Sequence, residues 1–122
     1  MKKIILAFCL LCSVIIVFAQ KTQQQKIDSV CGLIKKYWAA KNADKIYARA
    51  GEEFKQQASL ADFKTACTVT LFPKGNMKTT FESFENGTSK YKAVFTSDSL
   101  SFYLSLDNKN KLGTFSFTAY EK

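Results

Sequence analysis

Pro73-Lys74-Gly75-Asn76 divides the chain into a part with helical periodicity and a part with strand periodicity. Proline and glycine interrupt regular structure, because proline lacks an amide N–H and glycine readily adopts turn conformations. Before this break, apolar side chains recur about every 3.6 residues, and after it they alternate with polar ones. Helices that precede strands, instead of alternating with them, predict an α+β domain.

The part before the break begins with two predicted helices. Thr22 and Gln25 fit a capping box, and the first helix should run from there to about Ala40. Its apolar face comprises Ile27, Val30, Cys31, Ile34 and Trp38. Asn42 can cap a second helix that reaches Ala50, with Gly51 at the left-handed position that commonly ends helices.

Two shorter helical segments follow. Glu52 to Gln57 predicts a short turn of helix, and Ser59 can cap a third helix whose Asp62 favours the positive end of the helix dipole. This third helix should end near Thr70. Its expected buried face comprises Leu60, Phe63, Ala66 and Cys67.

Four strands are predicted after the break, because successive side chains of a strand point to opposite faces. The alternating residues that mark them are Met77, Thr79 and Phe81, a weaker pattern; Tyr91, Ala93 and Phe95; Leu100, Phe102, Leu104 and Leu106; and Gly113, Phe115, Phe117 and Ala119. The turn sequences between them are Asn86-Gly87, Ser97-Asp98 and Asp107-Asn108-Lys109-Asn110. This order predicts an antiparallel meander.

The N-terminus has the pattern of an export signal, with Lys2 and Lys3 before an unbroken apolar run from Ile4 to Ala19. We expect residues 1–19 to be a signal peptide, and residues 20–122 to be a single domain in the periplasm or outside the cell. Contact with a membrane is then expected only during export. The alternatives are an uncleaved anchor, for which the run is short, and a lipid anchor on Cys12, which the preceding Leu11 disfavours.

Composition excludes several classes of site. The net charge is +8, but the lysines are spread over predicted helices, a strand and a turn, which is typical of a solvated surface, and we expect no nucleic-acid partner. The chain contains no histidine, which excludes Ser-His-Asp and Cys-His catalysis and the common imidazole metal sites within one chain. We therefore expect no metal and no cofactor.

Cys31 and Cys67 are the cysteines that would remain after signal-peptide cleavage. In an oxidising compartment they could form a disulfide that closes a loop of about 36 residues. They could equally be two small buried thiols, since cysteine is often buried without pairing. Both interpretations stay open.

Several segments spread over most of the mature chain carry a family resemblance. They are Tyr47 with Phe54-Lys55; Ser59-Leu60-Ala61-Asp62-Phe63; Lys90-Tyr91-Lys92-Ala93-Val94-Phe95; and Leu104-Ser105-Leu106-Asp107 with Lys111-Leu112-Gly113-Thr114-Phe115-Ser116-Phe117. Together they resemble the bacterial domain of unknown function 3887, in the nuclear transport factor 2-like group. The resemblance implies helices packed on a curved four-stranded antiparallel sheet, a cystatin-like cone, with an accessory or small-ligand-binding role. The serine hydrolase domain that often follows this domain is not found before Lys122, and the group often forms homodimers through the sheet.

Aromatic side chains are the candidates for a ligand pocket, because they could hold an apolar or ring-shaped ligand. The candidates are Tyr37, Trp38, Tyr47, Phe54, Phe63 and Phe102. At these spacings they also fit a plain hydrophobic core. Tyr103 alternates with Phe102, so we expect it on the outer face of the sheet, where it could contact a partner.

The sequence thus predicts an exported non-enzymatic accessory or small-ligand-binding domain of a bacterial envelope. Its partner would be a small apolar ligand or an envelope protein. One alternative is a protein-interaction or inhibitor domain that acts through the open sheet face. The other is a small enzyme that uses Asp and Tyr in acid-base chemistry, although no residue is assigned a catalytic role.

Overall fold

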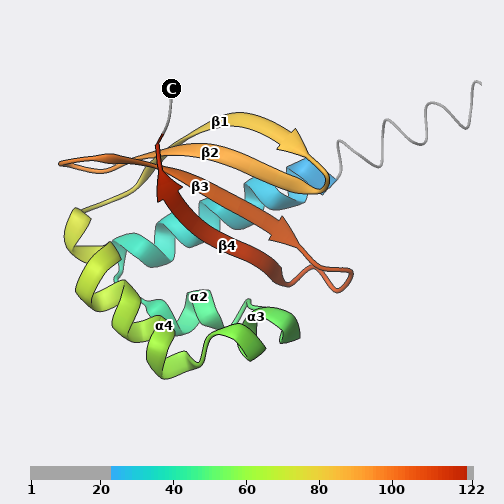
Figure 1. Cartoon of the computed structure of the whole chain (residues 1–122), viewed down its shortest axis with the longest axis horizontal. Coiled ribbons are helices and arrows are strands. Elements are labelled where there is room, and N and C mark those ends of the chain that lie inside the picture. The colour runs from blue at the N-terminus through green and yellow to red at the C-terminus, as the bar shows by residue number, and fades with distance from the viewer. Residues whose placement is uncertain (1–22, 121–122) are drawn as a thin grey trace, which may run out of the picture.

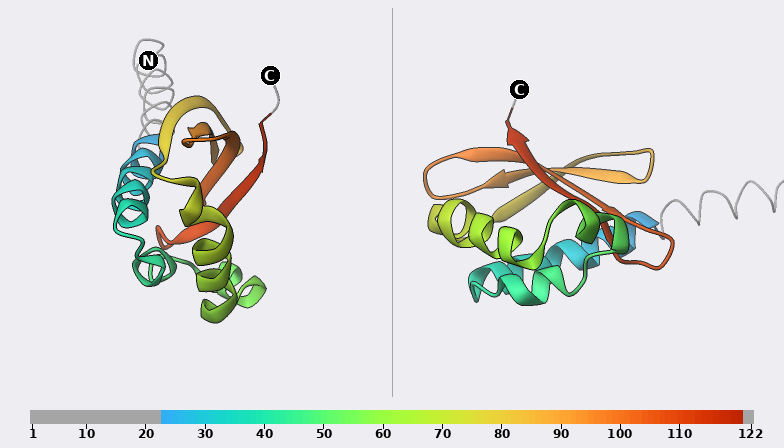
Figure 2. Two further views of the ribbon diagram at one scale, coloured as in Figure 1. Left: turned by 90° about the vertical axis from the view of Figure 1, so that its left-hand side faces the viewer. Right: turned by 60° about the horizontal axis from the view of Figure 1, so that its bottom comes forward.

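The structure, a computed structural model, describes residues 23–120. Helices cover one face of a four-stranded antiparallel sheet, and the other face is open (Figures 1 and 2). The strand order β1-β2-β3-β4 is that of a meander, and the sheet does not close into a barrel. The predicted α+β fold, with N-terminal helices on a four-stranded antiparallel sheet, is confirmed. The predicted signal peptide, residues 1–19, lies outside the described residues.

The first helix spans residues 23–39 and packs its apolar side chains against the sheet. Ile27 and Ile34 are fully buried, and Trp38 is 2% exposed. The helix ends where Lys41 adopts a positive φ of 55°. There the Asn42 amide donates a hydrogen bond to the carbonyl of Tyr37 at 2.8 Å. The buried face predicted from the 3.6-residue period is confirmed.

Three short helices follow: α2 (Ala43–Tyr47), α3 (Glu52–Gln57) and α4 (Leu60–Ala66). The caps predicted at Asn42 and Ser59 are present, whereas Thr22 of the predicted capping box lies outside the described residues. The Asn42 side chain accepts a hydrogen bond from the Lys45 amide at 3.2 Å, and the Ser59 hydroxyl accepts one from the Asp62 amide at 3.1 Å. These bonds satisfy backbone donors that a helix N-terminus otherwise leaves free.

The predicted end of the second helix is wrong. Helix α2 ends at Tyr47, and Gly51 has an extended conformation, with φ −82° and ψ 173°, immediately before α3. The reason is a tertiary contact that the local sequence does not reveal. The Gly51 amide donates to the Leu112 carbonyl at 2.8 Å, and Ala50 forms an isolated parallel bridge with Leu112.

The predicted face of the third helix is half right. Phe63 and Cys67 are buried, whereas Leu60 is 42% exposed and Ala66 is also exposed. Helix α4 touches the core along a narrow strip, and it continues as a π-helix, η1 (Cys67–Leu71), and a short 3-10 turn, η2 (Phe72–Lys74). The helical segment therefore extends beyond Thr70 to the break at Gly75.

The sheet consists of β1 (Lys78–Glu85), β2 (Thr88–Val94), β3 (Ser99–Leu106) and β4 (Leu112–Ala119). The first hairpin turns at Asn86 and Gly87, whose φ angles of 52° and 77° suit the tight turn that this dipeptide favours. In register, Tyr91 lies opposite Phe102, which lies opposite Phe117. These three residues share the inner face of the sheet, as the alternation predicts.

The core lies between the inner face of the sheet and the helices. The rings of Phe102 and Phe117 stack with centroids 4.5 Å apart. Trp38 packs against Phe72, Phe95 and Phe117 at centroid distances of 5.3 to 5.7 Å. The Trp38 indole N–H also donates to the Gly75 carbonyl at 2.9 Å, which satisfies the only polar atom of that side chain.

Candidate functional site

The six aromatic pocket candidates are distributed over the core and its border. Trp38, Phe63 and Phe102 are 2%, 7% and 0% exposed, and Tyr37, Tyr47 and Phe54 are half-buried. The structure brings Tyr47, Phe54 and Phe63 together, with ring centroids 5.5 to 6.3 Å apart. These rings fill space against one another. Of the six candidates, only Tyr37 lines either of the two clefts described next.

The larger cleft has a volume of about 660 Å³ and lies between α3 and the turn that joins β3 to β4. We call it the hairpin cleft. Its charged lining residues are Glu52, Glu53, Lys55, Asp107, Lys109 and Lys111. Ala50 and Leu112, which also line the cleft, are buried, with exposed fractions of 4% and 2%. The volume falls within the range of about 300 to 1,000 Å³ that is common for small-molecule sites.

Asp107 holds the turn beside this cleft in one conformation. Its Oδ1 accepts hydrogen bonds from the backbone amides of Lys109 at 2.8 Å and Lys111 at 2.9 Å. Its own amide donates to the Lys111 carbonyl at 2.7 Å, and Asn110 adopts a positive φ of 61°. A side chain on Gly51 would collide with the Asp107 carboxylate. The absence of a Cβ at Gly51 thus lets the turn approach the segment before α3.

The smaller cleft, about 360 Å³, shares Lys111 with the hairpin cleft. We call it the cationic cleft. Its lining residues are Tyr37, Lys45, Ala48, Arg49, Asn110 and Lys111, three of which are cationic and none acidic. The Lys45 ammonium lies 5.7 Å from the centroid of the Tyr37 ring. The lysines are dispersed along the sequence, and no sequence pattern singles out Arg49, the only arginine of the chain.

Cys31 and Cys67 are both buried free thiols, so no disulfide joins them in the structure. The Cys31 thiol donates weakly to the Thr79 hydroxyl, with sulfur and oxygen 3.8 Å apart. Burial raises the pKa of the Cys31 thiol, and it raises the pKa of the Cys67 thiol to about 11. Both thiols therefore stay protonated near neutral pH, which makes them poor nucleophiles.

One Asp–Tyr pair bears on the acid-base alternative. The hydroxyl of Tyr91, a residue only 3% exposed, donates a hydrogen bond to the carboxylate of Asp28, an exposed residue of the first helix. Burial, followed by the hydrogen bond to Asp28, raises the pKa of Tyr91 far above its ordinary value. The nearby Ser89 hydroxyl is buried and has no hydrogen-bond partner among the described residues. Tyr91 lines neither of the two clefts.

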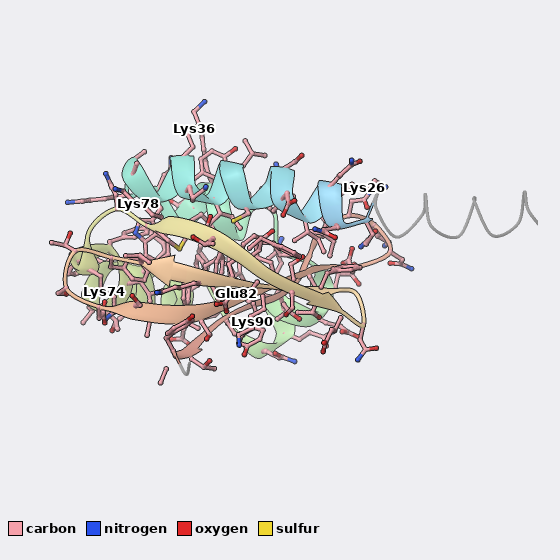
Figure 3. The ribbon with its side chains drawn as sticks, turned by 90° about the horizontal axis from the view of Figure 1, so that it is seen from above. Lys26, Lys36, Lys74, Lys78, Glu82 and Lys90 are labelled. Atoms are coloured by element: carbon pink, nitrogen blue, oxygen red, sulfur yellow. The ribbon has the colours of Figure 1, made fainter. Side chains whose placement is uncertain are left out.

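The outer face of the sheet is polar, and several of its charges are paired. Glu82 lies 3.8 Å from the Lys90 ammonium and accepts a hydrogen bond from the Tyr120 hydroxyl at 2.8 Å (Figure 3). The Lys92 ammonium stands 4.8 Å from the centroid of the Tyr120 ring. Tyr103 lies on this face between Lys90 and Ser116, as predicted, and is half-buried.

Residues 23–120 contain no group of three Cys, Asp or Glu side chains arranged to hold a metal ion. The same stretch has no helix with the length and apolarity needed to cross a membrane. No protein-family model matches the chain, and no curated protein and no solved structure is detectably similar to it.

Proposed function

We propose that this chain is an exported, non-enzymatic binding domain that takes a small ligand bearing charged groups in the hairpin cleft. The observation that carries the proposal is the cleft itself, about 660 Å³ in volume, beside a turn that Asp107 fixes. A site that is already formed loses little conformational entropy when a ligand binds. Export and envelope location enter the proposal from the sequence pattern of residues 1–19.

The lining residues of the hairpin cleft fit a ligand with polar groups better than they fit the purely apolar ligand that the aromatic residues predict. Lys55 and Lys109 can pair with an anionic group, and Glu52 and Glu53 can pair with a cationic one. The aliphatic stems of the lysines can cover an apolar body between those groups. The aromatic candidates Trp38, Phe63 and Phe102 are occupied with packing against one another and their neighbours.

The acid-base alternative is less well supported. The Tyr91 hydroxyl donates a hydrogen bond to Asp28. Because the pKa of Tyr91 is raised, the hydroxyl stays protonated and cannot act as a base. The interaction alternative has the open outer face in its favour, but Glu82 and Lys90 on that face already pair with each other. The antiparallel sheet and its helical cover are compatible with the resemblance to the nuclear transport factor 2-like group, which stays part of the proposal.

Native mass spectrometry of the protein purified from its own envelope tests this function. We expect a co-purified small molecule, and we expect Lys55→Gln to reduce its occupancy. Lys36→Gln is the matched control, because it removes the same charge from an exposed position on the first helix (Figure 3) that does not line the cleft. A stoichiometric protein partner without any small molecule would favour the interaction alternative instead. Equal occupancy in both variants would place the ligand elsewhere.

A further inference from the structure

We infer that the cationic cleft is a second binding site, specific for a doubly charged oxyanion of the phosphomonoester class. It is lined by Tyr37 from the first helix, by Lys45, Ala48 and Arg49 from α2 and the residues after it, and by Asn110 and Lys111 from the β3–β4 turn. This site is distinct from the hairpin cleft, since the two lining sets share only Lys111.

The three cations of the cleft form no ion pair with a described carboxylate. The ion pairs between described residues involve Lys64, Lys74 and Lys90, and none involves Lys45, Arg49 or Lys111. Asp44 on α2 is engaged with Lys64 at 3.3 Å. These cations repel one another, and like charges held together without counter-charges favour the uptake of an anion.

The carboxylate of Asp107 also lies near the cleft, and it is already hydrogen-bonded to the turn. Its Oδ1 accepts the amides of Lys109 and Lys111, and its Oδ2 faces Gly51 on the side of the hairpin cleft. The Asp107 carboxylate thus forms no ion pair with a described cation, although its charge lowers the positive potential at Lys111. The ammonium of Lys111 carries no ion pair with a described residue.

Backbone hydrogen bonds fix the two sides of the cleft relative to each other. The Arg49 carbonyl accepts from the Leu112 amide at 2.7 Å, and the Gly51 amide donates to the Leu112 carbonyl at 2.8 Å. The Asn110 amide donates to the Asp107 carbonyl at 3.0 Å. Residues distant in the sequence, Arg49 and Lys111, are thus held together before a ligand arrives, which lowers the entropic cost of binding.

The residue types define the ligand class. The planar guanidinium of Arg49 can bind two oxygens of one phosphate or carboxylate, while Lys45 and Lys111 act as point charges. Three cations match a phosphomonoester, which carries about −1.5 to −2 charges at pH 7, better than they match a single carboxylate. The half-buried Tyr37 ring offers an apolar surface for the organic part. A volume of 360 Å³ limits that part to a small group.

Phenyl phosphate is the probe, and benzoate and phenol are the matched comparison compounds. The protein is expressed from its full-length coding sequence, purified as the cell processes it, and titrated by ¹H–¹⁵N NMR at low ionic strength. We expect phenyl phosphate to shift the amides of Lys45, Arg49, Asn110 and Lys111, and to bind more tightly than benzoate and far more tightly than phenol. Added salt should weaken the binding, because the cations are solvent-accessible.

Variants separate this site from general charge attraction. Arg49→Gln should weaken phenyl phosphate binding by about tenfold or more, because a bidentate charged contact is lost. Lys45→Gln should weaken it severalfold, while Lys36→Gln and Lys55→Gln should leave it within about twofold. Should Arg49→Gln fail to fold, Lys45→Gln at an exposed position still provides the test.

Three results would overturn the inference. The first is a dissociation constant for phenyl phosphate weaker than about 10 mM. The second is an equal loss of binding in Lys45→Gln and Lys36→Gln, which would indicate only nonspecific attraction. The third is a loss of binding in Lys55→Gln, which would move the anion to the hairpin cleft. Failure of the anion site would leave the ligand proposed for the hairpin cleft unaffected, because Lys55 and Lys45 report on the two clefts separately.

Discussion

The region around Trp38 and the region around the β3–β4 turn are held together by different forces. Trp38 is buried among Phe72, Phe95 and Phe117, and its one polar atom is satisfied by Gly75. The turn is held by backbone hydrogen bonds and by the Asp107 carboxylate, and open clefts flank it. Apolar packing stabilises by removing apolar surface from water, and it leaves almost no empty volume. A turn held by hydrogen bonds can be rigid and still border an open cleft. This difference explains why the candidate sites lie where the aromatic packing ends.

The largest effect should come from removing the indole. We expect Trp38→Ala to lower the free energy of unfolding by about 3 to 5 kcal/mol, because a large buried ring is replaced by a cavity. Urea denaturation followed by circular dichroism measures it, since the variant has no tryptophan left to report. At the turn, Lys109→Ala should change the same free energy by less than about 0.5 kcal/mol.

Fluorescence of the parent protein gives an independent check on the same residue. At 2% exposure, the indole should be poorly quenched by acrylamide in the native state and readily quenched after unfolding. Ready quenching of the native protein would contradict the closed packing around Trp38. The Trp38 region would then be as open as the turn, and the structural difference that separates the core from the candidate sites would be lost.

Two glycines should respond to alanine in opposite directions. Gly75 has a φ of 98°, and an added Cβ would lie 2.7 Å from the Thr96 hydroxyl, so Gly75→Ala should destabilise by about 1 to 3 kcal/mol. Gly32 lies on the exposed side of the first helix, and an added Cβ there meets nothing within 4 Å. Gly32→Ala should therefore stabilise by about 0.5 to 1 kcal/mol.

Thermal and urea denaturation of the two glycine variants provide the measurement, with each variant as the other's control. If both variants lost stability, the space around Gly32 would have to be occupied, because an added Cβ there could not be accommodated. A neutral Gly75→Ala would mean that the segment before β1 can relax without disturbing Trp38.

At the turn, Asp107→Ala should cost less, about 1 to 2 kcal/mol, because the two amides that it binds can turn to water. The stronger effect should be local. Hydrogen exchange of the Lys109 and Lys111 amides should speed up while exchange in the first helix stays unchanged. Asn108→Ala is the control, since Asn108 is exposed and should leave both measurements as they are. Exchange that speeds up across the whole protein would show that the turn and the core unfold as one unit.

The sequence was a good guide wherever a structural feature depends on near neighbours. Apolar spacing located the buried face of the first helix, and the Asn42 and Ser59 caps follow from side chains that bond amides three residues on. The alternation of Phe102 and Tyr103 assigned the two faces of the sheet. Each of these predictions needs only the geometry of a single helix or strand.

The candidate sites depend on contacts between distant segments, and for that reason the sequence did not reveal them. The left-handed conformation predicted for Gly51 was wrong because Gly51 bonds to Leu112 instead. The same pairing brings Arg49 to Lys111 and creates both clefts. The only available signal was the chain's single arginine, which no periodicity connects to a lysine in a distant turn.

The smallest expected effect is a change in how stability depends on alkaline pH. The buried Cys67 thiol has a pKa of about 11, against 9.0 for an exposed cysteine, so the folded state keeps the proton that the unfolded state releases. Its contribution to stability is fully present below pH 9 and is lost as the pH rises toward 11. One proton can contribute at most about 1.4 kcal/mol per pH unit.

Cys67→Ala isolates that contribution. The variant should be less stable than the parent at neutral pH, because a buried side chain is truncated, but its stability should fall less steeply between pH 9 and 11. Urea denaturation at several pH values measures the difference, because the two proteins differ only at residue 67. Parallel curves would mean that the thiol reaches water in the folded state. The packing around Cys67 would then be open like the turn, instead of closed like the surroundings of Trp38.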